Sequence, residues 1–195
     1  MSLARVSREL ERLGVLLVTD ARLPSVTRIV AGEPVKGSWW SHPRARAIYA
    51  VLEALEDGAA ALLVKLVSRK LTFVHRALWP ELFSVAMARD DWQTRGLSRS
   101  ATSLLERVDA EKMFRVESGS SKAAREIEER LLAHGSQQHT ETGAHAKVLT
   151  TWEETARLRD YRLERTDPAS ARAALENRIR SWEGAKLPWE PGRTK

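Results

Sequence analysis

The stretch from Leu62 to Met87 constrains the fold of this chain more than any other. In 62–67 the apolar set Leu62, Val64 and Leu66 alternates with a set that contains Lys65, and in 71–76 the set of Leu71 and Phe73 alternates with one that contains Thr72 and Arg76. Both runs are rich in β-branched or aromatic residues. This period of two is typical of a β-ribbon with one buried face. The polar residues 68–70 between the runs have the length of a hairpin connection, although they lack the expected Gly or Asn. After Arg76 the apolar spacing becomes that of one helix face, so the sequence predicts strand, turn, strand and helix.

The same stretch is strongly basic. Between Leu62 and Pro80 it contains no Asp or Glu and four cations, which are Lys65, Arg69, Lys70 and Arg76. A β-ribbon with cations at its tip has the form of the wing in winged-helix proteins, where it contacts a phosphate backbone. That interpretation requires the Arg69 and Lys70 side chains to project into solvent while the helix from Leu78 packs behind. The alternative is a structural hairpin with a solvated turn.

Periodicity along the rest of the chain predicts a mostly helical protein with short β-hairpins. We expect helices over 3–13, 24–31, 43–55, 98–108, 122–134, 152–161 and 167–182. We expect short strands over 15–18 and 113–116, and a second ribbon or ordered loop over 136–149. These elements predict an α+β fold with one or two winged-helix-like units. The expected organisation is one domain over 1–165, a C-terminal helix over 166–183 and a flexible tail over 184–195.

The helix expected over 43–55 begins in an unusual hexamer, Trp39-Trp40-Ser41-His42-Pro43-Arg44. Proline suits the first turn of a helix because the N–H that it lacks would have no helical partner there. Arg44 and Arg46 lie at the end of the helix dipole that favours anions, so a bound phosphate would stabilise them. The alternative is two solvated arginines.

Composition points to a soluble protein with a polyanionic partner. The net charge is +6, and residues 1–100 hold 15 Lys and Arg against 10 Asp and Glu. Such an excess is compatible with nucleic acid, and double-stranded DNA is the expected partner. No signal peptide or membrane span is visible, and cysteine is absent. We therefore expect a cytoplasmic protein with no membrane partner.

Motifs of common enzymes are missing from the sequence. GxSxG, P-loop, GxGxxG and HExxH patterns do not occur. Three histidines and a glutamate within 134–145 raise the question of a metal site, but their spacing matches no common ligand pair. We therefore expect no metal and no cofactor. Four polar side chains of this segment are candidates for reading a base edge or for catalysis: Gln137, Gln138, His139 and Glu141.

Three segments together resemble the winged-helix units of the AlkZ-type DNA glycosylase superfamily, in particular its small AlkZ-related bacterial members. The segments are WWSHPRARAIY (39–49), KLTFVHRALWPELFSVA (70–86) and HTETGAHAKVL with the Trp that follows (139–152). The resemblance implies winged-helix units that grip DNA through basic wings. Glycosylases of the family carry a catalytic Gln-x-Gln or Gln-x-Asp, and Gln137-Gln138-His139 departs from it at two positions. The resemblance thus implies DNA binding more than base excision.

Three functions are compatible with the sequence. The first is binding of double-stranded DNA by the basic hairpin and by the start of the helix over 43–55. The second is base excision on a flipped nucleotide, which would make the protein a hydrolase. The third is a protein-interaction module with an exposed Trp39 and Trp40. Whether the protein is an enzyme, and its oligomeric state, stay open at this point.

Overall fold

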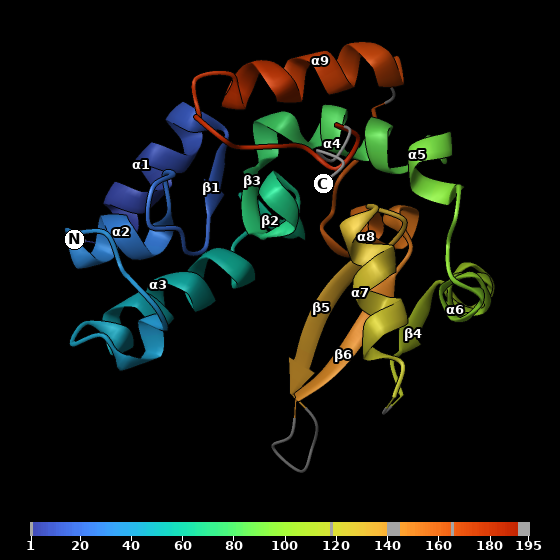
Figure 1. The fold of residues 1–195 in the computed structure, drawn as a ribbon, viewed down its shortest axis with the longest axis horizontal. Coiled ribbons are helices and arrows are strands. Elements are labelled where there is room, and N and C mark those ends of the chain that lie inside the picture. The colour runs from blue at the N-terminus through green and yellow to red at the C-terminus, as the bar shows by residue number, and fades with distance from the viewer. Residues whose placement is uncertain (1, 118, 140–144, 165, 191–195) are drawn as a thin grey trace. The chain divides into compact units, whose positions relative to one another are not determined.

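The fold is α+β, as the sequence predicts. The structure is a computed structural model, and it describes residues 2–117, 119–139, 145–164 and 166–190. In these residues helices predominate, and the strands form two three-stranded antiparallel sheets (Figure 1). The chain divides into two compact units where the sequence suggests one domain over 1–165. Unit 1 comprises Met1–Trp79 and Ala173–Leu187, and unit 2 comprises Pro80–Arg172 and Pro188–Lys195.

Unit 1 follows the chain order helix, strand, two helices and two strands. Its regular elements are α1 (Ser2–Leu13), β1 (Val15–Leu17), α2 (Val26–Ala31), α3 (Ala45–Asp57), β2 (Ala61–Lys65) and β3 (Leu71–His75). Three 3₁₀ turns connect or follow them: η1 (Trp39–Ser41), η2 (Val67–Arg69) and η3 (Arg76–Leu78). The sheet order is β1-β3-β2, and both pairings are antiparallel. The predicted strand–turn–strand of residues 62–76 is therefore confirmed as the β2–β3 hairpin. The expectation of a single buried face is wrong, because the consecutive residues Thr72, Phe73 and Val74 of the central strand are all buried.

The core of unit 1 lies between this sheet and the apolar faces of its helices. Phe73 on the central strand lies opposite Leu16 on one side and Leu63 on the other, and its side chain is fully buried. The helix residues that pack with it are Val6 and Leu10 from α1, Val26 and Val30 from α2, and Ile48, Val51, Leu52 and Leu55 from α3. These are the positions that helical spacing in the sequence assigns to buried faces. Apolar periodicity therefore accounts for how the helices cover the sheet.

Unit 2 contains a second sheet with the same kind of strand order, β4-β6-β5. In chain order its elements are α4 (Trp79–Ala86), α5 (Asp91–Thr94), α6 (Arg99–Glu111), β4 (Met113–Arg115), α7 (Ser121–Glu129), β5 (His134–His139), β6 (His145–Thr150) and α8 (Trp152–Leu158). Helix α9 (Pro168–Ile179) follows and contributes residues to both units. The second predicted ribbon is confirmed as β5 and β6, which run side by side (Figure 1).

Helix α7 is shorter than the sequence predicts. The apolar spacing suggested a helix over 122–134, but α7 ends at Glu129. Leu131 adopts the left-handed conformation, with φ of 53°, and such a residue ends a helix. The N–H of Leu132 then returns to the carbonyl of Ile127, at 3.0 Å, and His134 begins strand β5. Leu131 and Leu132 are buried as predicted, but from a turn and not from a helix.

The segment after α9 is held in place over part of the length predicted to be a flexible tail. The N–H of Ser68 donates to the carbonyl of Lys186 at 2.7 Å, and Leu187 is buried. Residues 184–187 are therefore fixed to unit 1 beside the η2 turn. None of the helices that the structure describes is long and apolar enough to cross a membrane.

Candidate nucleic-acid interface

The tip of the β2–β3 hairpin is a closely bonded turn. Ser68 and Arg69 have φ values of 52° and 57°, the conformation for which hairpin turns usually use Asn or Gly. The hydroxyl of Thr72 offsets this local cost, because it accepts from the N–H of Val67 at 3.2 Å and donates to the carbonyl of Lys70 at 2.9 Å. Together with the Ser68–Lys186 hydrogen bond, these contacts tie the tip to unit 1.

Lys70 does not project freely from this tip. Its ammonium lies 2.6 Å from a carboxylate oxygen of Asp20, whose side chain is only 9% exposed. The other carboxylate oxygen accepts from the backbone N–H groups of Arg22 and Leu23, at 2.8 and 2.9 Å. Lys70 is exposed, as the wing interpretation requires, but its ammonium is held in an internal ion pair, which counts against a phosphate contact by this residue. Its positive charge is already balanced within the unit, which weakens its attraction for a phosphate.

The surroundings of Asp20 favour its charged form. Burial acts to raise the pKa of this carboxyl, but the hydrogen bonds from Leu23, Lys70 and Arg22 outweigh burial and hold the pKa below its ordinary value. A carboxyl with a lowered pKa in the folded state stabilises the fold above its unfolded pKa. This stabilisation disappears as the pH falls through the folded pKa.

We expect Asp20→Ala to lower the free energy of unfolding by about 2 kcal/mol at pH 7, because hydrogen bonds to a charged group are lost. Urea unfolding measures this, and the difference from the unmodified protein should shrink as the pH falls below about 4. Asp91→Ala is the matched control, since its ion pair with Arg95 is highly exposed on both sides and should contribute less than about 0.5 kcal/mol. Equal losses in both variants would contradict the stabilising role of Asp20.

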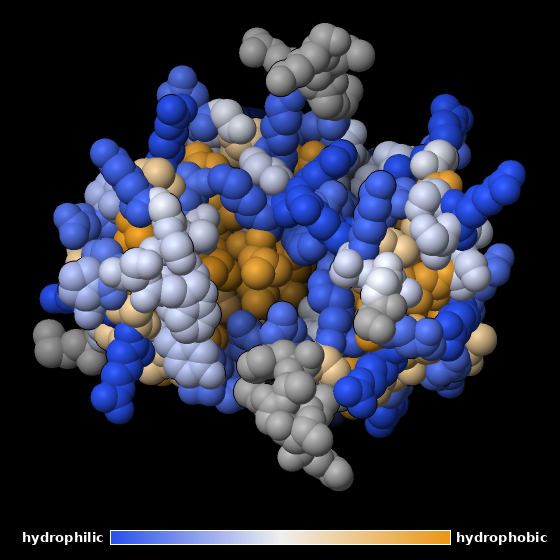
Figure 2. All heavy atoms as spheres, turned by 60° about the horizontal axis from the view of Figure 1, so that its bottom comes forward, coloured by the Kyte–Doolittle hydropathy of each residue, from blue (hydrophilic) through white to orange (hydrophobic). Residues whose placement is uncertain are grey.

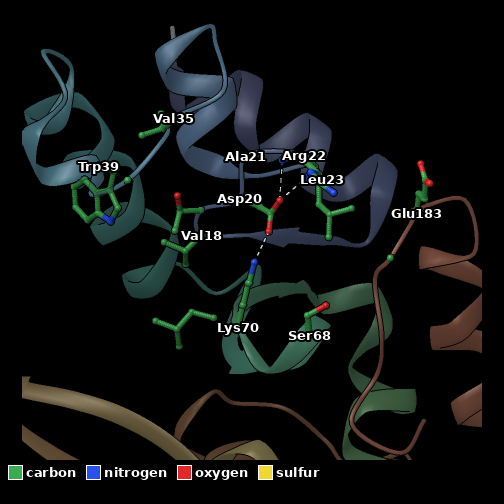
Figure 3. A pocket seen from close by; sticks show the side chains of 14 residues that line it. Val18, Asp20, Ala21, Arg22, Leu23, Val35, Trp39, Ser68, Lys70 and Glu183 are labelled. Atoms are coloured by element: carbon green, nitrogen blue, oxygen red, sulfur yellow. Dashed lines mark hydrogen bonds and ion pairs between the residues drawn. The ribbon is translucent and has the colours of Figure 1, made fainter. Parts of the chain in front are cut away.

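A shallow cavity of about 820 Å³ lies beside this ion pair (Figure 3). Its lining comes from the loop after β1, from the hairpin tip, from the segment before α3 and from the residues after α9. Trp39 from η1 and Lys70 from the hairpin tip both line it.

The start of α3 presents two of the predicted cations. The residues between Glu33 and Glu53 include no Asp or Glu, and Arg44 and Arg46 are exposed. Arg44 is the N-cap of α3, and its side chain makes no capping hydrogen bond. Its guanidinium donates one hydrogen bond to the carbonyl of Val30, at 2.9 Å, which orients the side chain. A guanidinium has five N–H donors, so others remain to contact an anion. An anion placed here would meet two arginines and the positive end of a helix dipole.

Arg76 lies at the other end of α3. Its guanidinium donates to the carbonyl of Ala59 at 3.2 Å and is 4.8 Å from the ring centroid of Trp79. Ala59 follows the last turn of α3, so Arg76 is separated from Arg44 by about the 20 Å length of a 13-residue helix. The predicted cations therefore do not gather at one place. Lys65 is half-buried on β2, and Arg69 is exposed in the turn.

The exposed surface of α3 changes character along its length. Its last turns carry the exposed acids Glu53, Glu56 and Asp57, while its first turns carry arginines and Tyr49. Long hydrophilic side chains also project from much of the surface in Figure 2. A polyanion would be attracted to the beginning of α3 and repelled from its end.

The candidates of the second ribbon lie in unit 2. Gln137 is exposed on β5, and its strand partner on β6 is Lys147. Gln138 and His139 continue the backbone of β5, and Glu141 lies outside the described residues. Within the described part of the chain, no group of three or more His, Asp or Glu residues is placed to hold a metal ion. The cavity of Figure 3 includes none of these candidates.

Two features of this interface have no counterpart in the sequence analysis. One is Asp20, whose partner Lys70 is 50 positions away in the sequence. Asp20 could have been noticed as a turn residue, because an Asp side chain commonly accepts from the backbone N–H groups two and three residues later. The other is Lys36, an exposed cation in the same acid-free segment as Arg44. A search for runs without Asp or Glu would have included it.

Position in the fold is therefore what distinguishes these cations from one another. Arg44 and Arg46 stand at the start of a helix, Lys70 is neutralised by a buried carboxylate, and Arg76 is at the far end of α3.

Comparison of the chain with protein-family models, with curated proteins and with solved structures gave no match.

Proposed function

We propose that the protein binds double-stranded DNA through unit 1, with α3 as the recognition helix of a winged-helix unit. The order helix, strand, helix, helix, strand, strand, with sheet order β1-β3-β2, supports this proposal. It is the arrangement in which the second helix of a helix-turn-helix is followed by a β-hairpin wing. In such units the N-terminal residues of the recognition helix approach the DNA.

The observation that carries the proposal is the charge pattern of α3. Its N-terminal turn bears the exposed Arg44 and Arg46, and its acids are confined to the C-terminal turns. A recognition helix that enters DNA by its N-terminus needs this polarity, because acids in the groove would repel phosphate. The β2–β3 hairpin then acts as a wing whose shape is fixed by Thr72 and Asp20, and Lys70 is not among its phosphate contacts.

Unit 2 supports the family resemblance that the sequence suggests. Its elements α6, β4, α7, β5 and β6 repeat the order found in unit 1 with one helix fewer, and the sheet order is again first, third, second strand. A relationship to the AlkZ-type superfamily implies tandem or single winged-helix units, and a repeated element order suits the tandem form. The proposal therefore includes a relationship to the AlkZ-type superfamily and a cytoplasmic location for the protein.

No observation favours the base-excision alternative over binding. Gln137 is an exposed side chain on a strand, whereas excision requires a pocket that encloses a flipped base. An incision assay on alkylated duplexes, comparing the protein with its Gln137→Ala variant, tests this alternative directly.

The proposal is tested by the salt dependence of duplex binding. Three exposed cations of the acid-free segment, Lys36, Arg44 and Arg46, would neutralise about three phosphates. The slope of log affinity against log salt should then be near −3, since each phosphate contact in a duplex contributes about −0.9. Fluorescence anisotropy with a labelled duplex, titrated at several salt concentrations, gives this slope. Affinity that does not change with salt would rule out the proposed contacts.

A further inference from the structure

A pair of stacked tryptophans lies directly before the basic start of α3. Trp39 and Trp40 have ring centroids 3.8 Å apart and planes inclined by 25°. Trp39 is half-buried against the core of unit 1, so one ring of the stack is anchored. Trp40 is 63% exposed, although it is a large aromatic side chain. Burial against the core is therefore the role of Trp39 and not of Trp40.

The geometry holds Trp40 in a defined orientation. One face of its indole is covered by Trp39, and the ring centroid of Tyr49, on the exposed side of α3, is 5.9 Å away. Tyr49 is itself 41% exposed and is held by a hydrogen bond from its hydroxyl to Glu53, at 3.2 Å. Although Trp39 stacks on it and Tyr49 lies nearby, most of Trp40 is exposed. An aromatic ring already fixed in this way loses little conformational entropy when a flat ligand stacks on it.

The charges around Trp40 indicate which ligand would stack there. Lys36, Arg44 and Arg46 lie within six residues of Trp40 in the sequence and are exposed. The flanking acids already have partners, since Glu53 accepts from the Tyr49 hydroxyl and Glu33 lies 3.5 Å from His42. A protein partner with an apolar surface would not need these cations. A nucleotide base needs both features, since its face stacks on an aromatic ring while its phosphates contact neighbouring cations.

We propose that Trp40 is a stacking platform for an unpaired base, so that the protein prefers duplex DNA containing a bulge or a single-stranded junction over a fully paired duplex. This inference rests on the proposed DNA binding and adds the class of DNA that is bound. Arg44 and Arg46 hold the adjoining phosphates, and an unpaired base stacks on the exposed part of the Trp40 ring. In a fully paired duplex the base faces are occupied by their neighbours, and Trp40 makes no such contact.

The test compares two labelled duplexes that differ only in a central two-nucleotide bulge. We expect the protein to bind the bulged duplex about tenfold more tightly, since stacking of one base on an aromatic side chain supplies a preference of this order. Trp40→Ala should remove the preference while leaving affinity for the fully paired duplex within twofold. Trp40→Phe should keep most of it. Leu158→Ala is the matched control, because Leu158 is a 52% exposed apolar residue of unit 2 and should change neither affinity.

Salt dependence separates stacking from charge. For the bulged duplex, Trp40→Ala should weaken binding by the same factor at every salt concentration, because stacking releases no counterions. Equal affinity of the unmodified protein for the two duplexes would overturn the stacking role and leave duplex binding intact. Failure to bind either duplex would overturn both proposals. If sedimentation showed a dimer that Trp40→Ala dissociates, Trp40 would be a protein contact and the stacking role would be wrong.

Discussion

Replacing Arg44 and Arg46 together with alanine is expected to lower the affinity for duplex DNA by about 10- to 100-fold at 0.1 M salt. The binding constant varies as the salt concentration raised to a power of about −0.9 for each phosphate contact. At 0.1 M salt, two contacts therefore strengthen binding about 60-fold relative to about 1 M salt, where this electrostatic contribution vanishes. The slope of log affinity against log salt should become shallower by about 2. Anisotropy titrations of both proteins over a series of salt concentrations measure the two effects together.

The control for this double variant removes the same charge from another helix of unit 1. Arg5 and Arg8 are exposed on α1, so Arg5→Ala with Arg8→Ala lowers the net charge equally. We expect less than a threefold loss of affinity, because no phosphate contact is assigned to α1. A thermal melt must accompany both variants, since Arg44 also donates to the carbonyl of Val30. Equal weakening by the two double variants would mean that binding follows total charge and not the position of α3.

Local patterns were enough to predict the secondary structure of unit 1. The period of two in residues 62–76 gave the β2–β3 hairpin, and the spacing of Ile48, Val51 and Leu55 gave the buried face of α3. Such patterns work because the buried side of a strand or helix is decided by residues close together in the sequence. The α+β class follows from the same information.

The state of the hairpin tip could not be predicted in this way. Lys70 and Arg69 are adjacent and look equivalent in the sequence, but Lys70 meets the carboxylate of Asp20 from the loop after β1. That contact depends on β1 pairing with β3, and hence on long-range topology. Arg76 was misleading for the same reason, since only the fold places it at the far end of α3 from Arg44. Charge composition thus suggested a polyanionic partner, whereas position in the fold decides which cations could contact one.

The contact between α7 and β5 is another long-range feature, and it predicts a large loss of stability. A Cβ added to Gly135 would lie 2.0 Å from a carboxylate oxygen of Glu128 and 2.7 Å from the carboxylate carbon. Glu128 is buried and forms an ion pair with Lys147, at 2.7 Å. We expect Gly135→Ala to lower the free energy of unfolding by about 3 kcal/mol or more, because it displaces a buried charge from its partner. Urea unfolding at pH 7 measures the loss.

A double-mutant cycle identifies the cause of this loss. In a Glu128→Ala background the added methyl group no longer meets the carboxylate, so Gly135→Ala should cost at least about 1 kcal/mol less than it does in the unmodified protein. Gly119→Ala is the control for backbone preference alone: its φ is +93° and no atom lies within 4 Å of the added Cβ, so we expect about 1 kcal/mol. Additive costs of Gly135→Ala and Glu128→Ala would show that the strand backbone, and not the buried carboxylate, requires glycine at this position. A smaller cost of Gly135→Ala in the Glu128→Ala background would instead establish that Gly135 allows the end of α7 to pack directly on β5. It would also establish that the Glu128–Lys147 pair depends on this close approach.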